Sequence, residues 1–146
     1  IAVETAIACG AEVVLTPEVP FDFEKDVIEV LKEGRANGRK HNIIVVAEGV
    51  DMDVREMAKL IKEKTDIDTR ATILGHIQRG GSPTVRDRVA ASQMGHKAVH
   101  LLMDGIGNRV VVQKNDNIVD YDIYEALCME RSVNNELYNI AHDISI

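Results

Sequence analysis

The chain has 146 residues, 45% of them hydrophobic and 28% charged, so it is long enough to bury a core of domain size. A formal net charge of -7 and an aromatic content of 3% argue against a surface that binds nucleic acid or stacks single-stranded bases. No run approaches the roughly 18 apolar residues of a membrane-spanning helix, so we expect neither nucleic acid nor a membrane among the partners.

Helices and short buried strands alternate along the first half of the chain. Residues 12–16 and 42–47 are apolar runs typical of strands, and residues 71–74 form a third. Helices beginning at Asp22 and at Asp51 or Asp53 lie between these strands. This order predicts an α/β fold with right-handed connections, a doubly wound, mostly parallel sheet and helices on both faces.

The two ends of the chain add other elements. Residues 1–8 are typical of an amphipathic helix without an initiating Met or a capping residue before it, so we expect a longer protein. After residue 84 the pattern predicts a long helix over 85–104, a hairpin of strands 109–113 and 117–121, and helices over 123–129 and 134–142. Cys9 and Cys128 have no metal or redox spacing, which favours reduced thiols in the cytoplasm.

A loop rich in polar chemistry follows the third predicted strand. It has the sequence GHIQRGGSP over residues 75–83. The planar cation of Arg79 suits a phosphate, and the paired glycines let backbone N–H groups approach an anion. Glu48 ends the preceding strand, so it should share the carboxyl edge of the sheet with His76 and Arg79. A carboxylate for sugar hydroxyls beside two phosphate-binding side chains predicts a sugar-phosphate site.

The opposite edge of the sheet holds a second candidate site. Glu12 begins the first strand, and the run Arg39, Lys40 and His41 precedes the second. A solvated turn is the usual role of such a run, and a small anion pocket is the alternative.

Several segments together resemble bacterial phosphofructokinases. They are TRATILGHIQRGGSP at residues 69–83, GAE at 10–12, GRKH at 38–41, AE at 47–48 and DR at 87–88. The resemblance spans nearly the whole chain and implies the carboxy-terminal portion of an enzyme that transfers a phosphoryl group from Mg-ATP to fructose 6-phosphate.

The resemblance also implies roles for individual residues. Glu48, His76 and Arg79 match positions that contact fructose 6-phosphate. Arg70 matches a residue that reaches the neighbouring subunit's site, which implies a homotetramer. Arg70 begins its predicted strand about four residues of 3.3 Å each before the loop, so it cannot easily reach a phosphate held by Arg79 of the same subunit. An exposed arginine at the edge of the sheet is the alternative.

An effector site is implied at the other edge. Glu12, Arg39, Lys40 and His41 match positions that bind ADP, GDP or phosphoenolpyruvate, with the effector's magnesium near Glu12 and Gly10. Asn37 departs from the family pattern, because members often carry a basic residue there. We therefore expect weak effector control.

The same resemblance sets the expected domains and the missing parts. Residues 1–83 would form a sugar-phosphate-binding domain truncated at its start, and 84–146 would pack on it and on an absent amino-terminal domain. The family's nucleotide motif and its aspartate base, in the segment TIDND, do not occur here. We expect the chain alone to be inactive. A pyrophosphate-dependent enzyme and a non-catalytic binding module remain alternatives.

One further pair of residues has metal-ligand spacing. His96 and His100 lie four residues apart on the predicted long helix, but no third ligand is spaced to join them. We interpret them as helix-surface residues.

Overall fold

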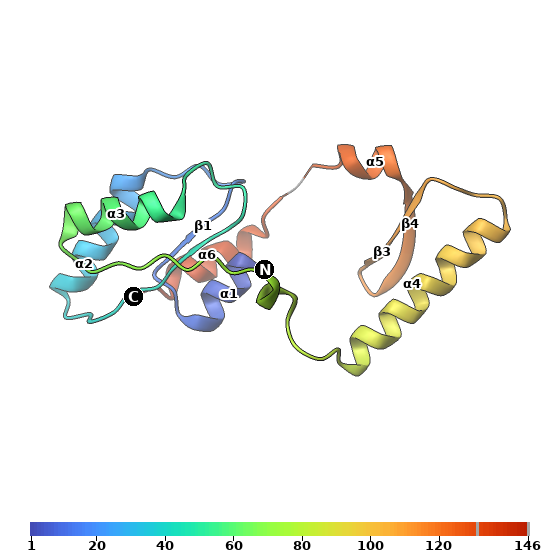
Figure 1. Cartoon of the computed structure of the whole chain (residues 1–146), viewed down its shortest axis with the longest axis horizontal. Coiled ribbons are helices and arrows are strands. Elements are labelled where there is room, and N and C mark those ends of the chain that lie inside the picture. The colour runs from blue at the N-terminus through green and yellow to red at the C-terminus, as the bar shows by residue number, and fades with distance from the viewer. Residues whose placement is uncertain (131, 146) are drawn as a thin grey trace. The chain divides into compact units, whose positions relative to one another are not determined.

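The computed structural model describes residues 1–130 and 132–145, which form two compact units (Figure 1). The first unit holds residues 1–73 and 132–145, and the second holds residues 74–130. The elements of the first unit are α1 (Ala2–Cys9), β1 (Val13–Leu15), η1 (Glu24–Glu29), α2 (Val30–Ala36), β2 (Ile44–Val46), α3 (Val54–Thr65) and α6 (Asn135–Asp143). Those of the second are η2 (His76–Arg79), α4 (Val85–Met103), β3 (Arg109–Lys114), β4 (Asn117–Asp122) and α5 (Ile123–Cys128).

A parallel pair of strands forms the centre of the first unit. β1 pairs with β2 in the register Val13–Ile44, Val14–Val45 and Leu15–Val46. Side chains alternate between the two faces of such a pair, so each face contributes to a different core. One core joins the strands to η1, α2 and α3, and its buried residues are Val13, Leu15, Val27, Ile28, Leu31, Met57 and Ile61. The other joins them to α1 and α6, through Ala6, Ala11, Val14 and Ala141. The parallel strands therefore have helices on both faces, as predicted.

The predicted helix starts are confirmed. Asp22 begins the second helix, because its Oδ1 accepts the Lys25 N–H at 2.9 Å and its own N–H donates to Asp26 at 2.7 Å. The first turns of this helix are π-helical, and the adjacent residues Val27 and Ile28 are both fully buried there. Of the two aspartates proposed to start α3, Asp53 is the cap, since it accepts the backbone N–H groups of Arg55 and Glu56.

The prediction of a strand at residues 71–74 is wrong. These residues have no regular secondary structure, and Ile73 and Leu74 are 61% and 50% exposed. A strand exists only through hydrogen bonds to a neighbour, and the sheet of the described residues in this unit contains β1 and β2 alone. The apolar run has the composition of a strand, but composition cannot show whether a neighbouring strand is present to pair with it.

The second unit is ordered mainly by local interactions. A capping box starts α4, in which Asp87 accepts the Thr84 backbone and side-chain groups at 2.7 Å each while its own N–H donates back to Thr84. These bonds hold the pKa of Asp87 below its usual value. Asn115 and Asp116, both with positive φ, form the turn between β3 and β4, as predicted.

An ion-pair cluster joins α4 to this hairpin. Asp120 lies 2.7 Å from Lys97 Nζ and 2.7 Å from Arg109 Nη2, and its side chain is 16% exposed. The hydrogen bond from Lys97, and then that from Arg109, holds the pKa of Asp120 below its usual value. No residue between 74 and 130 is buried, and large apolar side chains of α4 and α5 face solvent, among them Val85, Val99, Leu102, Met103, Tyr124 and Leu127.

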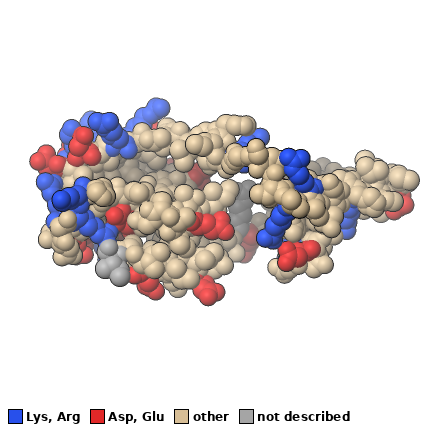
Figure 2. All heavy atoms as spheres, turned by 90° about the horizontal axis from the view of Figure 1, so that it is seen from below, with Lys and Arg blue, Asp and Glu red and all other residues tan. Residues whose placement is uncertain are grey.

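Charged side chains of both signs are spread over the surface. On the face drawn in Figure 2, Lys and Arg side chains are interspersed with Asp and Glu side chains and separated by broad uncharged areas. Among the described residues, none of the helices combines the length and the apolar character needed to cross a membrane.

The Asp120 cluster should make the hairpin sensitive to acid. Because folding lowers this pKa, the stabilisation is complete above the unfolded value of about 4 and is lost as the pH falls through the folded value. We expect Asp120→Asn to destabilise the hairpin at pH 7, with a difference from wild type that shrinks below about pH 4. Thermal unfolding of the hairpin, followed by NMR at several pH values, measures this.

Asp116→Asn is the matched control, because the Asp116–Arg86 pair is 84% and 82% exposed. Such a pair should contribute little. Equal losses in the two variants at pH 7, or a difference for Asp120→Asn that persists in acid, would contradict the assignment.

Candidate functional site

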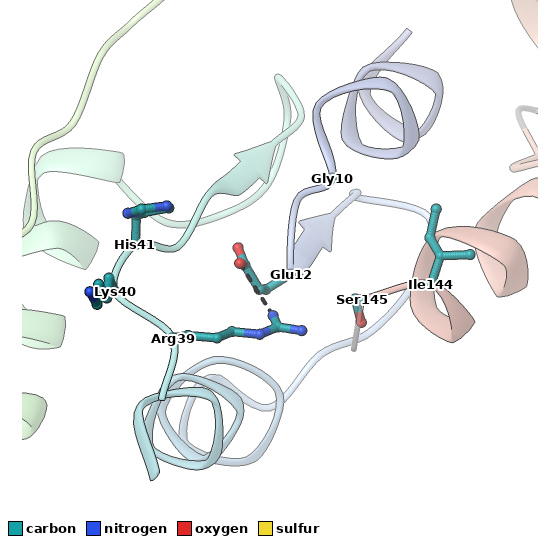
Figure 3. A pocket seen from close by; sticks show the side chains of 7 residues that line it. All are labelled: Gly10, Glu12, Arg39, Lys40, His41, Ile144 and Ser145. Atoms are coloured by element: carbon teal, nitrogen blue, oxygen red, sulfur yellow. Dashed lines mark ion pairs between the residues drawn. The ribbon is translucent and has the colours of Figure 1, made fainter. Parts of the chain in front are cut away.

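One pocket of the first unit brings together five residues that the sequence placed in an effector site. It has a volume of about 310 Å³ and is lined by Gly10, Glu12, Arg39, Lys40, His41, Ile144 and Ser145 (Figure 3). The anion-pocket interpretation of the basic run therefore has a cavity to support it.

Two helix-ending turns and the start of the strand pairing position the lining residues. Gly10 ends α1 with φ 65°, a left-handed conformation that favours glycine, and its N–H donates to the last carbonyls of that helix. Just before β1, the Glu12 N–H donates to the Ile43 carbonyl at 3.0 Å. After α2, the Arg39 N–H donates to the Gly34 carbonyl at 3.0 Å. Gly34 also leaves room for the Arg39 side chain, since a Cβ there would lie 3.2 Å from Arg39 Cδ.

An ion pair crosses the pocket. Arg39 Nη1 lies 3.2 Å from Glu12 Oε1, and Glu12 Oε2 accepts the Ile43 N–H at 2.5 Å. Figure 3 shows Arg39 extending toward Glu12, whereas Lys40 lies on the other side of the backbone. Neither Lys40 nor His41 forms an ion pair with any residue that the structure describes. An incoming anion thus meets a guanidinium that it must share with Glu12, while Lys40 and His41 line the pocket without an ion pair to any described residue.

Ile144 and Ser145, which the sequence did not indicate, form another wall of the pocket. They follow α6, which packs on α1 and β1 through Ala141 and Tyr138. Ser145 Oγ donates to the His142 carbonyl at 2.7 Å. No local pattern links these residues to Glu12 more than 130 positions earlier, and only the packing of α6 reveals them.

The pocket offers few ligands for a metal. Among the described residues, no group of three His, Cys, Asp or Glu side chains is placed to hold an ion. Glu12 brings a carboxylate to the pocket, and Gly10 lines it as well. Magnesium is usually held by one or two carboxylates and the phosphates of its ligand, so this donor set fits a magnesium ion that arrives with a phosphate ester.

Glu48 lies where the sequence placed it, at the carboxyl end of β2. The Ala47 N–H donates to the Leu15 carbonyl at 2.8 Å, which extends the pairing to the residue before Glu48. Gly49 then turns the chain with φ 94°, and a Cβ on it would lie 3.5 Å from Pro17. Glu48 itself is exposed.

Arg70 lies in the first unit beside the free edge of the sheet. It lines a small groove of about 120 Å³ together with residues of β2 and α3, including Ile44, Val46, Met57 and Ile61. Its side chain is exposed.

His76 and Arg79 occupy η2, a single turn of 3-10 helix in the second unit. Gln78 fixes this turn by donating its side-chain amide to the Leu74 carbonyl at 2.6 Å, and Gly80 ends it with φ 81°. Both His76 and Arg79 are exposed. The meeting of these residues with Glu48 stays a prediction, because Glu48 and Arg70 belong to the other unit.

The comparisons with known proteins agree with the motifs. A family model described as phosphofructokinase matches residues 1–102. The chain belongs to the phosphofructokinase family. Its α/β fold, with helices on both faces of a parallel pair, is that of the family, and the structure of phosphofructokinase from Saccharomyces cerevisiae matches it with a TM-score of 0.72 at 29% identity. That match covers 99% of this chain and 21% of the yeast chain.

Curated relatives of this phosphofructokinase chain are more similar in sequence. ATP-dependent 6-phosphofructokinases of Lysinibacillus sphaericus and Bacillus cytotoxicus are 51% and 48% identical to it over all 146 residues. The enzyme of that name from Clostridium botulinum is 50% identical over 145 residues. The chain spans 45% of the length of each of these relatives.

The Glu12–Arg39 pair predicts how the pocket responds to a bare anion. Glu12→Gln frees Arg39 from a pair whose side chains are only 10% and 22% exposed. Because a hydrogen bond between charged groups contributes about 1.5 kcal/mol or more, pyrophosphate without magnesium should bind about tenfold more tightly. Isothermal titration calorimetry measures the change.

Arg39→Ala serves as the opposite control and should weaken pyrophosphate binding. Unchanged affinity in Glu12→Gln would show that the carboxylate does not compete for the guanidinium.

Proposed function

We propose that this chain is part of an ATP-dependent 6-phosphofructokinase. The observation that carries the proposal is the identity of 48–51% over the whole chain to enzymes of that name. The reaction is transfer of the γ-phosphoryl group of ATP to the 1-hydroxyl of fructose 6-phosphate, giving fructose 1,6-bisphosphate in cytoplasmic glycolysis. The names of these relatives favour ATP over pyrophosphate as the donor, and an enzyme over a non-catalytic module.

The acceptor half of the active site is assigned to Glu48, His76 and Arg79. The Glu48 carboxylate accepts hydrogen bonds from sugar hydroxyls, and its exposed place after β2 leaves it available to a ligand. His76 and Arg79 hold the 6-phosphate, with the guanidinium giving charge-assisted bonds to two oxygens. Their exposure on η2 supports this assignment.

The donor half of the reaction is assigned to residues outside these 146. Magnesium neutralises the transferring phosphoryl oxygens when it is bound with ATP. The chain's own residues orient the acceptor hydroxyl, and we expect no kinase activity from the chain alone.

The pocket at Glu12 is assigned to an effector. Arg39, Lys40 and His41 hold the phosphates of ADP, GDP or phosphoenolpyruvate, and Glu12 with Gly10 holds the magnesium of a nucleotide. Asn37, the C-cap of α2, brings no charge to the neighbouring turn, so control by effectors is weak.

Residues 84–146 are assigned to packing on residues 1–83 and on an amino-terminal domain of the longer enzyme. The apolar side chains of α4 and α5 that face solvent support this assignment, because surfaces of this kind are usually covered in folded proteins.

The first test of the proposed function concerns the binding of fructose 6-phosphate by Arg79, and it is made in the complete enzyme. Arg79→Ala removes a charge-assisted bidentate contact worth about 3 kcal/mol, so the KM for fructose 6-phosphate should rise on the order of 10²-fold. Steady-state kinetics measures this, and Arg55→Ala, an exposed cation of α3, is the control. An unchanged KM in Arg79→Ala would remove this residue from the site.

The role of Arg70 in a neighbouring subunit's site gives the second test. Arg70→Ala and Arg79→Ala subunits are each defective alone, but in a mixed tetramer some sites combine an intact Arg70 with an intact Arg79. If the subunits assort randomly, about one quarter of the sites recover. Activity at low fructose 6-phosphate after the two variants are unfolded and reassembled together measures the recovery. No recovery, despite mixed tetramers confirmed by mass spectrometry, would place both arginines in one subunit's site.

A further inference from the structure

Two exposed histidines lie one turn apart near the carboxyl end of α4. The Nε2 atoms of His96 and His100 are 3.1 Å apart, and their ring centroids are 4.3 Å apart. We propose that this pair is a binding site for a divalent transition-metal ion of the Cu²⁺, Ni²⁺ or Zn²⁺ type. Neither histidine is among the residues assigned to phosphoryl transfer or to the effector.

The separation of the two nitrogens matches that of neighbouring ligands on one metal. With metal–nitrogen bonds of about 2.0–2.1 Å and a ligand–metal–ligand angle between about 90° and 109°, two nitrogens lie roughly 2.8–3.4 Å apart. The observed distance falls inside this range. The regular backbone of α4 holds both rings on one face of the helix, since residues four positions apart are neighbours there.

The local charges favour a cation at this place. His100 lies in the last turn of α4, where the free carbonyls of the helix carry partial negative charge. Asp104 follows as the C-cap residue. The nearby cation Lys97 is directed toward the hairpin, where its Nζ lies 2.7 Å from Asp120 and 3.3 Å from the Ile118 carbonyl. Its ammonium group is therefore held at the hairpin, where it shares the Asp120 carboxylate with Arg109.

The ligand set decides which ions the site accepts. Among the described residues no third His, Cys, Asp or Glu completes a group with these two, so water fills the remaining positions. Imidazole suits copper, nickel and zinc, whereas magnesium and calcium prefer oxygen. Magnesium required for phosphoryl transfer should therefore not compete.

Metal binding replaces a hydrogen bond between the rings. Without metal, the Nε2–H of one neutral imidazole donates to Nε2 of the other. When both Nε2 lone pairs bind a metal, that proton moves to Nδ1 of its own ring. Two neutral imidazoles thus bind the ion without a net loss of protons.

Copper binding to the untagged full chain tests the proposal. The protein is freed of metal with EDTA, exchanged into buffer without chelator and titrated with CuCl₂, and the bound ion is observed by electron paramagnetic resonance. We expect one tight equivalent whose spectrum shows coupling to two imidazole nitrogens. His96→Gln and His100→Gln should each weaken binding by about tenfold or more, because chelation by the second ring is lost.

His142→Gln, which removes an exposed histidine of α6, is the matched control and should leave binding unchanged. Circular dichroism verifies that the helical content of each variant is intact. The proposal is overturned if His96→Gln and His100→Gln bind copper as tightly as wild type, or if millimolar MgCl₂ displaces the copper. It is also overturned if the wild-type spectrum shows one nitrogen ligand only.

Discussion

The parallel pairing of β1 and β2 is the interaction on which the first unit depends. It joins only three residues of each strand, yet it sends alternate side chains into two separate cores. A shift of register by one residue would exchange these faces and lose both cores. The same pairing places Glu12 at one end of the strands and Glu48 at the other, so two candidate sites share one structural support.

Features set by neighbouring residues were predictable from the sequence. The apolar runs predicted both paired strands, and the aspartates predicted the starts of two helices. An N-cap is local, because its side chain accepts hydrogen bonds only from backbone N–H groups of the next helical turn. The location of Glu48 also follows from local pattern, since the residue after a buried strand lies at the edge of the sheet. Grouping Glu12 with residues 39–41 required only parallel neighbours, whereas Gly10 was added by the resemblance to phosphofructokinases. All five residues line one pocket.

Features set by distant partners were not predictable. Residues 71–74 have the composition of a strand but no strand beside them, and composition cannot supply one. Ile144 and Ser145 reach the pocket because α6 packs on α1, which no local pattern encodes. The spacing of His96 and His100 was plain in the sequence, but only their side-chain conformations bring the two Nε2 atoms to 3.1 Å.

The pairing of Arg39 with Glu12 determines which anions we expect the proposed effector pocket to bind. A bare anion that takes Arg39 leaves Glu12, 10% exposed, beside a new negative charge. The Ile43 N–H is the single hydrogen-bond donor that Glu12 then retains among its described partners. An anion that arrives with a divalent cation avoids this cost, because the cation replaces Arg39 as the partner of the carboxylate. We therefore expect the proposed pocket to prefer ligands that carry both charges, because a carboxylate lies among its cationic side chains.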